Sequence, residues 1–273
     1  MKTRNLIIGL VATITFASCG GSGSKNTESV GGNTGGVTSQ SNEPLNISIY
    51  LDLSDRLKRD LTPSQKERDL AIVGHIADYF RSQTVGSKIL QSKNNIKVFF
   101  YPAPNSSDIA TLAEDLCIDI TKFNGVEKRI VLDGDANQGK PSLKERFNKN
   151  LSVIYDKALE AKEFPGCDIW DFFSNQNVDT QCIRDGFRNI LVILTDGYLF
   201  DEKHKVKNGD AYSYVTPATL KNPNTSLIVK RTGLEKLEVR ILEVNPTDIN
   251  HRDQLKAVLE NWLKGMGVKA IVS

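Results

Sequence analysis

Short apolar segments alternate with longer amphipathic segments throughout residues 45–273. The short segments have the composition of buried strands, and the longer ones carry apolar residues at helical spacing. This alternation is typical of domains in which helices cover both faces of a mostly parallel sheet. We therefore expect a doubly wound α/β fold. The expected strands are Asn46–Leu53, Ile96–Tyr101, Ile190–Thr195, Leu237–Val244 and Val268–Val272, and the expected helices are Pro63–Ser82, Asp108–Ile120, Leu143–Lys162 and His251–Met266.

A single domain accounts for these elements. Residues 45–273 contain neither a second linker nor an internal repeat. Their number lies within the usual range of one α/β domain with a full hydrophobic core. We therefore predict one domain over residues 45–273.

The N-terminus has the pattern of an export signal. Two basic residues precede an uncharged apolar stretch, Leu6–Phe16, which is too short to span a bilayer as a helix. Two small residues then stand directly before Cys19. This arrangement resembles a bacterial lipoprotein signal, which implies that residues 1–18 are removed and that Cys19 carries lipid. The alternative is an ordinary cleaved signal followed by an incidental cysteine.

The resemblance also implies where the protein lies. A lipid on Cys19, with palmitate among its acyl chains, would hold the protein on a membrane, on the periplasmic or cell-surface side, as in the Gram-negative outer membrane. Residues 20–44 are almost entirely Gly, Ser, Asn and Thr, so they cannot bury enough surface to fold. We expect residues 19–44 to form a flexible tether that reaches about 25–30 Å by random-coil scaling.

The net charge of the mature chain excludes one class of partner. Removing Lys2 and Arg4 with the signal leaves equal numbers of basic and acidic residues, 33 of each. Proteins that bind nucleic acid or use a polybasic membrane-binding surface carry a marked positive excess. We therefore expect no nucleic-acid partner.

Two of the expected strands end in a carboxylate. Asp52 ends the first strand in LDLSDR, and Asp196 follows the central strand in LTDG. In open α/β sheets, ligands bind where loops leave the carboxyl ends of the strands. We therefore expect Asp52 and Asp196 to lie at the same edge of the sheet, with Leu191–Leu194 buried behind them.

Taken in their order along the chain, these segments resemble a von Willebrand factor A domain. In that family the first strand ends in Asp-x-Ser-x-Ser, a later loop supplies a Thr, and a middle strand ends in Thr-Asp-Gly. Together these residues form the metal-ion-dependent adhesion site, which holds Mg²⁺ or Mn²⁺ and leaves one coordination position for a partner's carboxylate. The resemblance implies a domain that binds an envelope or extracellular protein and is not an enzyme.

The motif carries over residue by residue, with one break. Asp52 and Ser54 match the first and third positions, and Asp196 matches the last. Asp168 stands near the place of the family's Thr, where it is either a metal ligand or a helix cap. Arg56 replaces the second Ser, and a guanidinium offers donors only, so it would repel a metal or take its place.

Three interpretations of this group remain open. Asp52, Ser54, Asp168 and Asp196 are a candidate site for Mg²⁺ or Mn²⁺. Alternatively, Arg56 is a built-in counter-ion, and the domain is a metal-free scaffold. A metal-assisted hydrolase comes third, because paired carboxylates with a metal can activate water. The sequence contains no Gly-x-Ser-x-Gly, phosphate-loop or HExxH motif.

Other features have two interpretations each. Asp133–Gly139 spaces oxygen side chains as calcium loops do, but it lacks the expected Gly and Glu, so a solvent-facing turn is the default. Cys167 and Cys182 are either a disulfide or free thiols. The aromatic residues of the segment Trp170–Phe173 either form a partner-binding stripe or face the core.

Overall fold

The computed structural model describes residues 43–86, 89–102, 106–161, 167–198 and 231–273. Residues Pro44–Ser273 form one compact unit. The expected signal and Cys19, with all of the tether but its last two residues, lie outside the described residues. No helix of the described residues is long and apolar enough to cross a membrane.

A six-stranded sheet with the order β3-β2-β1-β4-β5-β6 organises the domain. Every neighbouring pair is parallel except β2 and β3, which are antiparallel. This is the strand order of a Rossmann-like sheet, so the expected α/β class and the mostly parallel sheet are confirmed. The strands are β1 Leu45–Leu51, β2 Asn95–Phe99, β3 Cys117–Asp119, β4 Arg188–Leu194, β5 Leu237–Leu242 and β6 Lys269–Val272.

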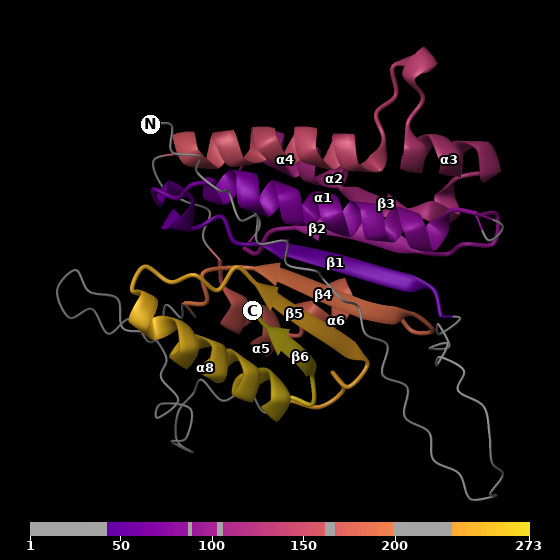
Figure 1. Cartoon of the computed structure of the whole chain (residues 1–273). Coiled ribbons are helices and arrows are strands. Elements are labelled where there is room, and N and C mark those ends of the chain that lie inside the picture. Colours follow the sequence, from indigo (N-terminus) through magenta and orange to yellow (C-terminus); the bar gives the residue numbers. More distant parts are fainter. Residues whose placement is uncertain (1–42, 87–88, 103–105, 162–166, 199–230) are drawn as a thin grey trace, which may run out of the picture. The chain divides into compact units, whose positions relative to one another are not determined.

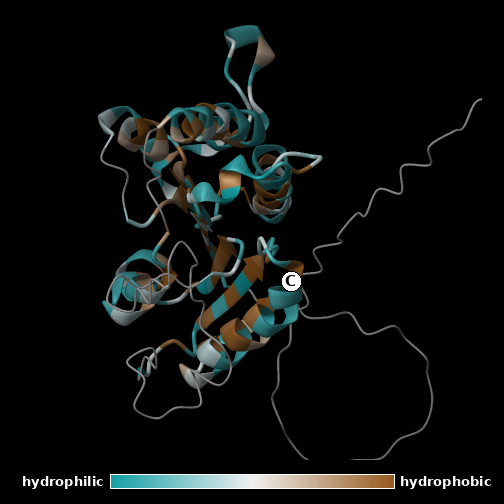
Figure 2. Ribbon diagram, turned by 90° about the vertical axis from the view of Figure 1, so that its left-hand side faces the viewer, coloured by the Kyte–Doolittle hydropathy of each residue, from teal (hydrophilic) through white to brown (hydrophobic). Residues whose placement is uncertain are grey.

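Helices cover both faces of the sheet, as Figure 1 shows. One face carries α1 Gln65–Thr84, α2 Ser107–Glu114, α3 Gly125–Asp133 and α4 Leu143–Glu160, and the other carries α5 Ile169–Ser174, α6 Asn177–Cys182 and α8 Arg252–Gly265. Figure 2 shows hydrophobic residues along the strands and a mixture of hydrophobic and hydrophilic residues on the helices. The short 3₁₀ turns are η1 Asp55–Lys58, η2 Ile120–Lys122, η3 Ala136–Gln138 and η5 Ile249–His251.

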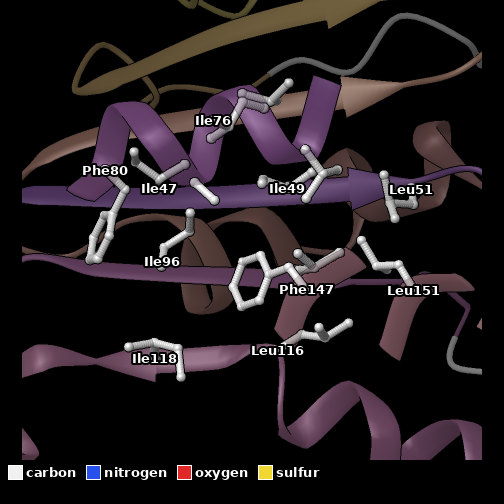
Figure 3. Close-up of a cluster of buried hydrophobic side chains, with 14 of the residues drawn as sticks. Ile47, Ile49, Leu51, Ile76, Phe80, Ile96, Leu116, Ile118, Phe147 and Leu151 are labelled. Carbon is white, nitrogen blue, oxygen red and sulfur yellow. The ribbon is translucent and has the colours of Figure 1, made fainter. Parts of the chain in front are cut away.

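The core lies in two layers, one on each side of the sheet. Along β1, Ile47, Ile49 and Leu51 point toward α1 and α4, whereas Tyr50 packs on the other face. This follows from the two-residue period of a strand, which sends successive side chains to opposite faces. Figure 3 shows the first layer, where the side chains of β1 and β2 meet those of α1 and α4.

The segment Asp108–Ile120 was expected as one helix, and this prediction is wrong. The helix α2 ends at Glu114, and the chain then forms β3. Ile118 is buried while its neighbour Cys117 is exposed, which is the alternation of an edge strand. Backbone pairing with β2 therefore overrides the helical pattern of the preceding residues.

The sequence interpretation also missed α3. Asn124 caps this helix by accepting hydrogen bonds from two backbone amides, and the Glu127 side chain reaches back to the Asn124 amide. Such a reciprocal capping box is a sequence signal for a helix start. The spacing of Asn124 and Glu127 therefore marks the start of α3 in the sequence.

Candidate functional site

Asp52 and Asp196 lie at one edge of the sheet, here called the carboxyl edge. Asp52 directly follows β1, and Asp196 comes two residues after the end of β4. These strands are parallel neighbours, with Leu51 opposite Leu194. Residues Leu191–Leu194 are buried, so the expected placement is confirmed. From these two strands the chain continues in opposite directions across the sheet, β1 toward β2 and β4 toward β5. Such a switch point is where open α/β sheets bind ligands.

The Asp52 carboxylate is buried and hydrogen-bonded on both oxygens. Its side chain accepts a hydrogen bond at Oδ1 from the backbone N–H of Ser54, at 2.8 Å, and at Oδ2 from the hydroxyl of Thr195, also at 2.8 Å. The residue is only 2% exposed. Asp52 therefore ties the loop after β1 to the end of β4.

Arg56, in η1, extends its guanidinium into this edge and is 1% exposed. Its Nε donates to the backbone carbonyl of Asp52 at 3.0 Å and lies 3.7 Å from Asp52 Oδ2. Its Nη2 donates to the backbone carbonyl of Leu194 at 3.2 Å. The guanidinium thus bridges the ends of β1 and β4.

A second carboxylate pairs with the guanidinium from the helix side. Arg56 Nη2 donates to Asp69 Oδ2, on α1, at 2.6 Å. The same oxygen accepts a hydrogen bond from the Tyr155 hydroxyl, on α4, at 2.6 Å, and Gln65 donates to Asp69 Oδ1 at 2.9 Å. We call Asp52, Arg56, Asp69 and Tyr155 the buried ion-pair cluster.

Electrostatics favour the charged guanidinium in this cluster. Burial opposes the charge on Arg56, but the nearby carboxylates of Asp69 and Asp52 raise its pKa above the ordinary value. Burial raises the Tyr155 pKa, and the Asp69 carboxylate beside it acts in the same direction. The cluster therefore holds one permanent positive charge and a neutral phenol.

Asp196 lies nearer to solvent than Asp52 but is still only 9% exposed. Its Oδ1 accepts a hydrogen bond from the backbone N–H of Tyr198 at 3.2 Å. Burial, and then the nearby charge of Asp52, raise the pKa of Asp196 to about 7. Gly197, the residue between Asp196 and Tyr198, has φ +95°. A Cβ at this position would come within 2.8 Å of a Val244 methyl group, so the turn requires glycine.

Asp168 caps a helix, which is one of the two roles expected for it. Its Oδ1 accepts a hydrogen bond from the backbone N–H of Asp171 at 2.8 Å, at the start of α5. Its own backbone N–H donates to the Tyr50 hydroxyl at 3.1 Å. The side chain therefore fixes the start of α5 and turns at least one oxygen inward to the backbone.

These residues do not fit Mg²⁺ or Mn²⁺ as they are arranged. Hard divalent cations need several converging oxygens with free lone pairs. The permanently charged guanidinium of Arg56 lies 3.7 Å from Asp52 Oδ2, where it would repel a divalent cation, and each Asp52 oxygen already accepts one hydrogen bond. Within the part of the chain that the structure describes, no group of three or more His, Cys, Asp or Glu residues is arranged to hold a metal ion.

The cysteines and the aromatic segment each had two interpretations. All three described cysteines, Cys117, Cys167 and Cys182, are free thiols, so the disulfide alternative is wrong in this structure. Phe172 and Phe173 are fully buried, which confirms the core interpretation for them.

The acidic segment at the end of α3 is a turn, as the default interpretation had it. Asp133 forms an ion pair with Arg81. Asp135 accepts hydrogen bonds from the backbone amides of Asn137 and Gln138, and the Gln138 side chain donates to its other oxygen. The carboxylates of Asp133 and Asp135 thus interact with groups of the protein itself.

Sequence reasoning missed Asp69, Tyr155 and Thr195 as members of the site. Asp69 carried a usable signal, because it lies four residues before Val73 on the buried stripe of α1, where a carboxylate needs a partner. Tyr155 and Thr195 carried none, because a hydroxyl in a buried segment is common.

Comparisons with known proteins identify no relative whose site could be compared with this one. No protein-family model, curated protein or solved structure matches the chain.

Proposed function

We propose that this chain is a lipid-anchored, von Willebrand A-like domain that binds a protein partner at the cell envelope, with Arg56 in place of a divalent cation. The observation that carries the proposal is the position of the guanidinium. It lies at the switch point of the sheet, buried between Asp52 and Asp69, and donates to the backbone carbonyls that end β1 and β4.

The charge on Arg56 explains why such a site needs no metal. An adhesion-site cation neutralises carboxylates and holds the loops of several strands together. The guanidinium pairs with two carboxylates and bridges two strand ends, and it stays charged at every physiological pH. Its donors are directed into the protein, so partner contacts come from the rim of the carboxyl edge.

Burial favours binding over catalysis at this edge. Asp52 and Asp69 are 2% and 0% exposed, so a substrate cannot reach either carboxylate without opening the fold. Around them, Ser54 and Tyr198 are half-buried and Asp55 is exposed. Such loops on a rigid sheet edge are where binding residues concentrate.

The anchor part of the proposal rests on the N-terminal sequence. The apolar segment Leu6–Phe16, the small residues before Cys19 and the tether that follows support export and lipid attachment. A tethered binding domain fits this arrangement, because its partner can be another envelope or extracellular protein.

Site-specific photocrosslinking in intact cells tests the proposed binding edge. A photoreactive amino acid at position 55, on the rim, should give a discrete protein adduct that persists in the presence of a chelator. The matched control is position 78, which is exposed on α1 nine residues beyond Asp69, away from the edge, and should give no such adduct. Equal adducts at both positions, or an adduct at position 55 that the chelator abolishes, would count against the proposal.

A further inference from the structure

The chain enters the folded domain at the opposite edge of the sheet, here called the amino edge. The backbone N–H of Leu45 donates to the Asn94 side chain at 2.8 Å, and the N–H of Arg188 donates to the Pro44 carbonyl at 2.9 Å. The first residues of β1, β2 and β4 therefore lie together, where the tether ends. Figure 1 shows the start of β1 on the same side of the domain as the turn before β2.

Two apolar side chains project from this edge. Leu90, in the turn before β2, and Val126, in the first turn of α3, are each 70% exposed, the largest values among the exposed large hydrophobic residues of the described chain. A Cβ on Gly125 would collide with the Leu90 side chain, so Leu90 lies directly against the residue before Val126. The two side chains form one small apolar surface.

A buried lysine holds this surface rigidly. Lys128, on α3, is 5% exposed and directs its ammonium group back into the turn. Its Nζ donates to three backbone carbonyls at 3.0–3.2 Å, those of Ile89, Leu90 and Ser92. Three acceptors satisfy all three donors of an ammonium group, so the turn is fixed to the helix.

Three exposed basic residues of the described chain lie within four positions of Leu90 or Val126 in the sequence. Lys93, Lys122 and Arg129 are all exposed, and none is in an ion pair with another residue of the described chain. Glu127 is the one exposed acid of the first turn of α3, and it is engaged in capping Asn124. We call Leu90, Lys93, Lys122, Val126 and Arg129 the amino-edge patch.

We propose that the amino-edge patch rests on the surface of the anionic bilayer to which the tether leads, so that the carboxyl edge points away from it. The inference rests on the lipid anchor of the proposed function. Apolar tips surrounded by cations complement a bilayer interface with anionic headgroups. Because the tether joins the domain at this same edge, the chain need not pass around the domain to bring the patch to the membrane.

The patch is too small to recruit the protein by itself. Each basic residue near an anionic surface contributes about 1 kcal/mol, and three are fewer than polybasic segments use. A short flexible tether, however, gives the patch an effective concentration in the millimolar range at the surface. Weak contacts then suffice to orient a domain that is already anchored, which agrees with its neutral overall charge.

Orientation has a consequence for the binding edge. The seven residues of β1 run from the amino edge to the carboxyl edge. At about 3.3 Å per residue, the strand holds the carboxyl edge about 20 Å farther from the membrane than the patch. The proposed partner site would therefore face outward, clear of the headgroups.

Tryptophan reporters in the lipidated full-length protein test this orientation. The protein is reconstituted in vesicles of phosphatidylethanolamine and phosphatidylglycerol with brominated acyl chains, which quench nearby indole emission. The reporters are Leu90→Trp and, as the matched control, Ile249→Trp, which replaces a residue 58% exposed at the carboxyl edge. We expect stronger quenching and a blue-shifted emission for Leu90→Trp than for Ile249→Trp, beyond the background of the two native tryptophans.

Further measurements separate the contribution of the basic residues from that of the lipid anchor. Replacing Lys93, Lys122 and Arg129 by Glu, or phosphatidylglycerol by phosphatidylcholine, should reduce the quenching of Leu90→Trp. Equal quenching at positions 90 and 249, with flotation that depends on Cys19, would overturn the orientation while the anchor stands. Flotation that does not depend on Cys19 would overturn the anchor, and with it this inference.

Discussion

The guanidinium of Arg56 and the carboxylate of Asp69 form an ion pair at 2.6 Å in which the side chains are 1% and 0% exposed. Removing two charges from water is unfavourable, and only close geometry with further hydrogen bonds offsets the loss of hydration. The Tyr155 hydroxyl and the Gln65 amide provide those hydrogen bonds to Asp69. The stability of the ion pair therefore depends on the hydrogen bonds that Tyr155 and Gln65 donate to Asp69.

Asp69→Asn should lower the free energy of unfolding by about 3 kcal/mol, toward the low end of the range for a broken buried pair. The substitution keeps the shape of the side chain but leaves the guanidinium with only Asp52 as a counter-ion, at 3.7 Å. Urea denaturation followed by circular dichroism measures the change.

Asp156→Asn is the matched control for this substitution. It removes the exposed ion pair between Lys66 and Asp156, which also joins α1 to α4. Exposed pairs contribute about 0–1 kcal/mol. If both substitutions cost the same, Arg56 is not held by Asp69 in the way described.

Asp196→Asn should change how stability depends on pH. Burial and Asp52 raise the Asp196 pKa from an ordinary value near 3.8 to about 7, so between these pH values the folded protein binds more protons than the unfolded chain. Stability from this group is therefore present at acidic pH and is lost as the pH rises through 7. The Asn variant lacks this loss, so its advantage over the wild type should grow from near zero at acidic pH to at most about 4 kcal/mol above neutrality.

Parallel denaturation series from acidic to mildly alkaline pH, with chelator present, measure the difference between the two proteins. The difference reports the ionisation of Asp196 together with its interaction with the Asp52 charge, because the groups away from this pair are common to both proteins. A difference that stays constant with pH would show that Asp196 ionises normally in the folded protein.

Cys19→Ser should move the protein from the membrane fraction to the soluble fraction without changing its melting temperature. The reason is that the proposed lipid is attached outside the folded unit Pro44–Ser273. Cell fractionation with immunoblotting, alongside thermal denaturation of the purified variant, provides the measurement. Retention of the variant in the membrane fraction would show that lipid on Cys19 does not anchor the protein.

The sheet could be predicted from sequence because its strands carry strong local signals. Ile190–Thr195 is apolar at nearly every position, and the structure places a buried central strand at Arg188–Leu194. The shared position of Asp52 and Asp196 could be predicted from these strands, since the carboxyl ends of parallel strands lie at one edge of a sheet. The short edge strand Cys117–Asp119 could not be found in this way, because pairing with β2 decides its conformation.

The buried ion-pair cluster was only half visible in the sequence. Arg56 stood out because it stands where the motif that this segment resembles has a serine, but its partner Asp69 is brought to it by the packing of α1 against the sheet. Tyr155 is separated from Asp69 by 86 positions in the chain and meets it only because α4 packs beside α1. Contacts between helices of this kind leave no trace in local sequence patterns.

Thermal denaturation with and without divalent cations tests the central claim, that Arg56 takes the place of a metal ion. An ion that binds only the folded state raises the melting temperature by mass action. We predict the same melting temperature for the wild type in chelator and in millimolar Mg²⁺ or Mn²⁺. Arg56→Ser should melt lower in chelator, because Asp52 and Asp69 lose their counter-ion, and Mn²⁺ or Mg²⁺ should restore part of the loss. A wild-type melting temperature that rises with either cation would contradict the account.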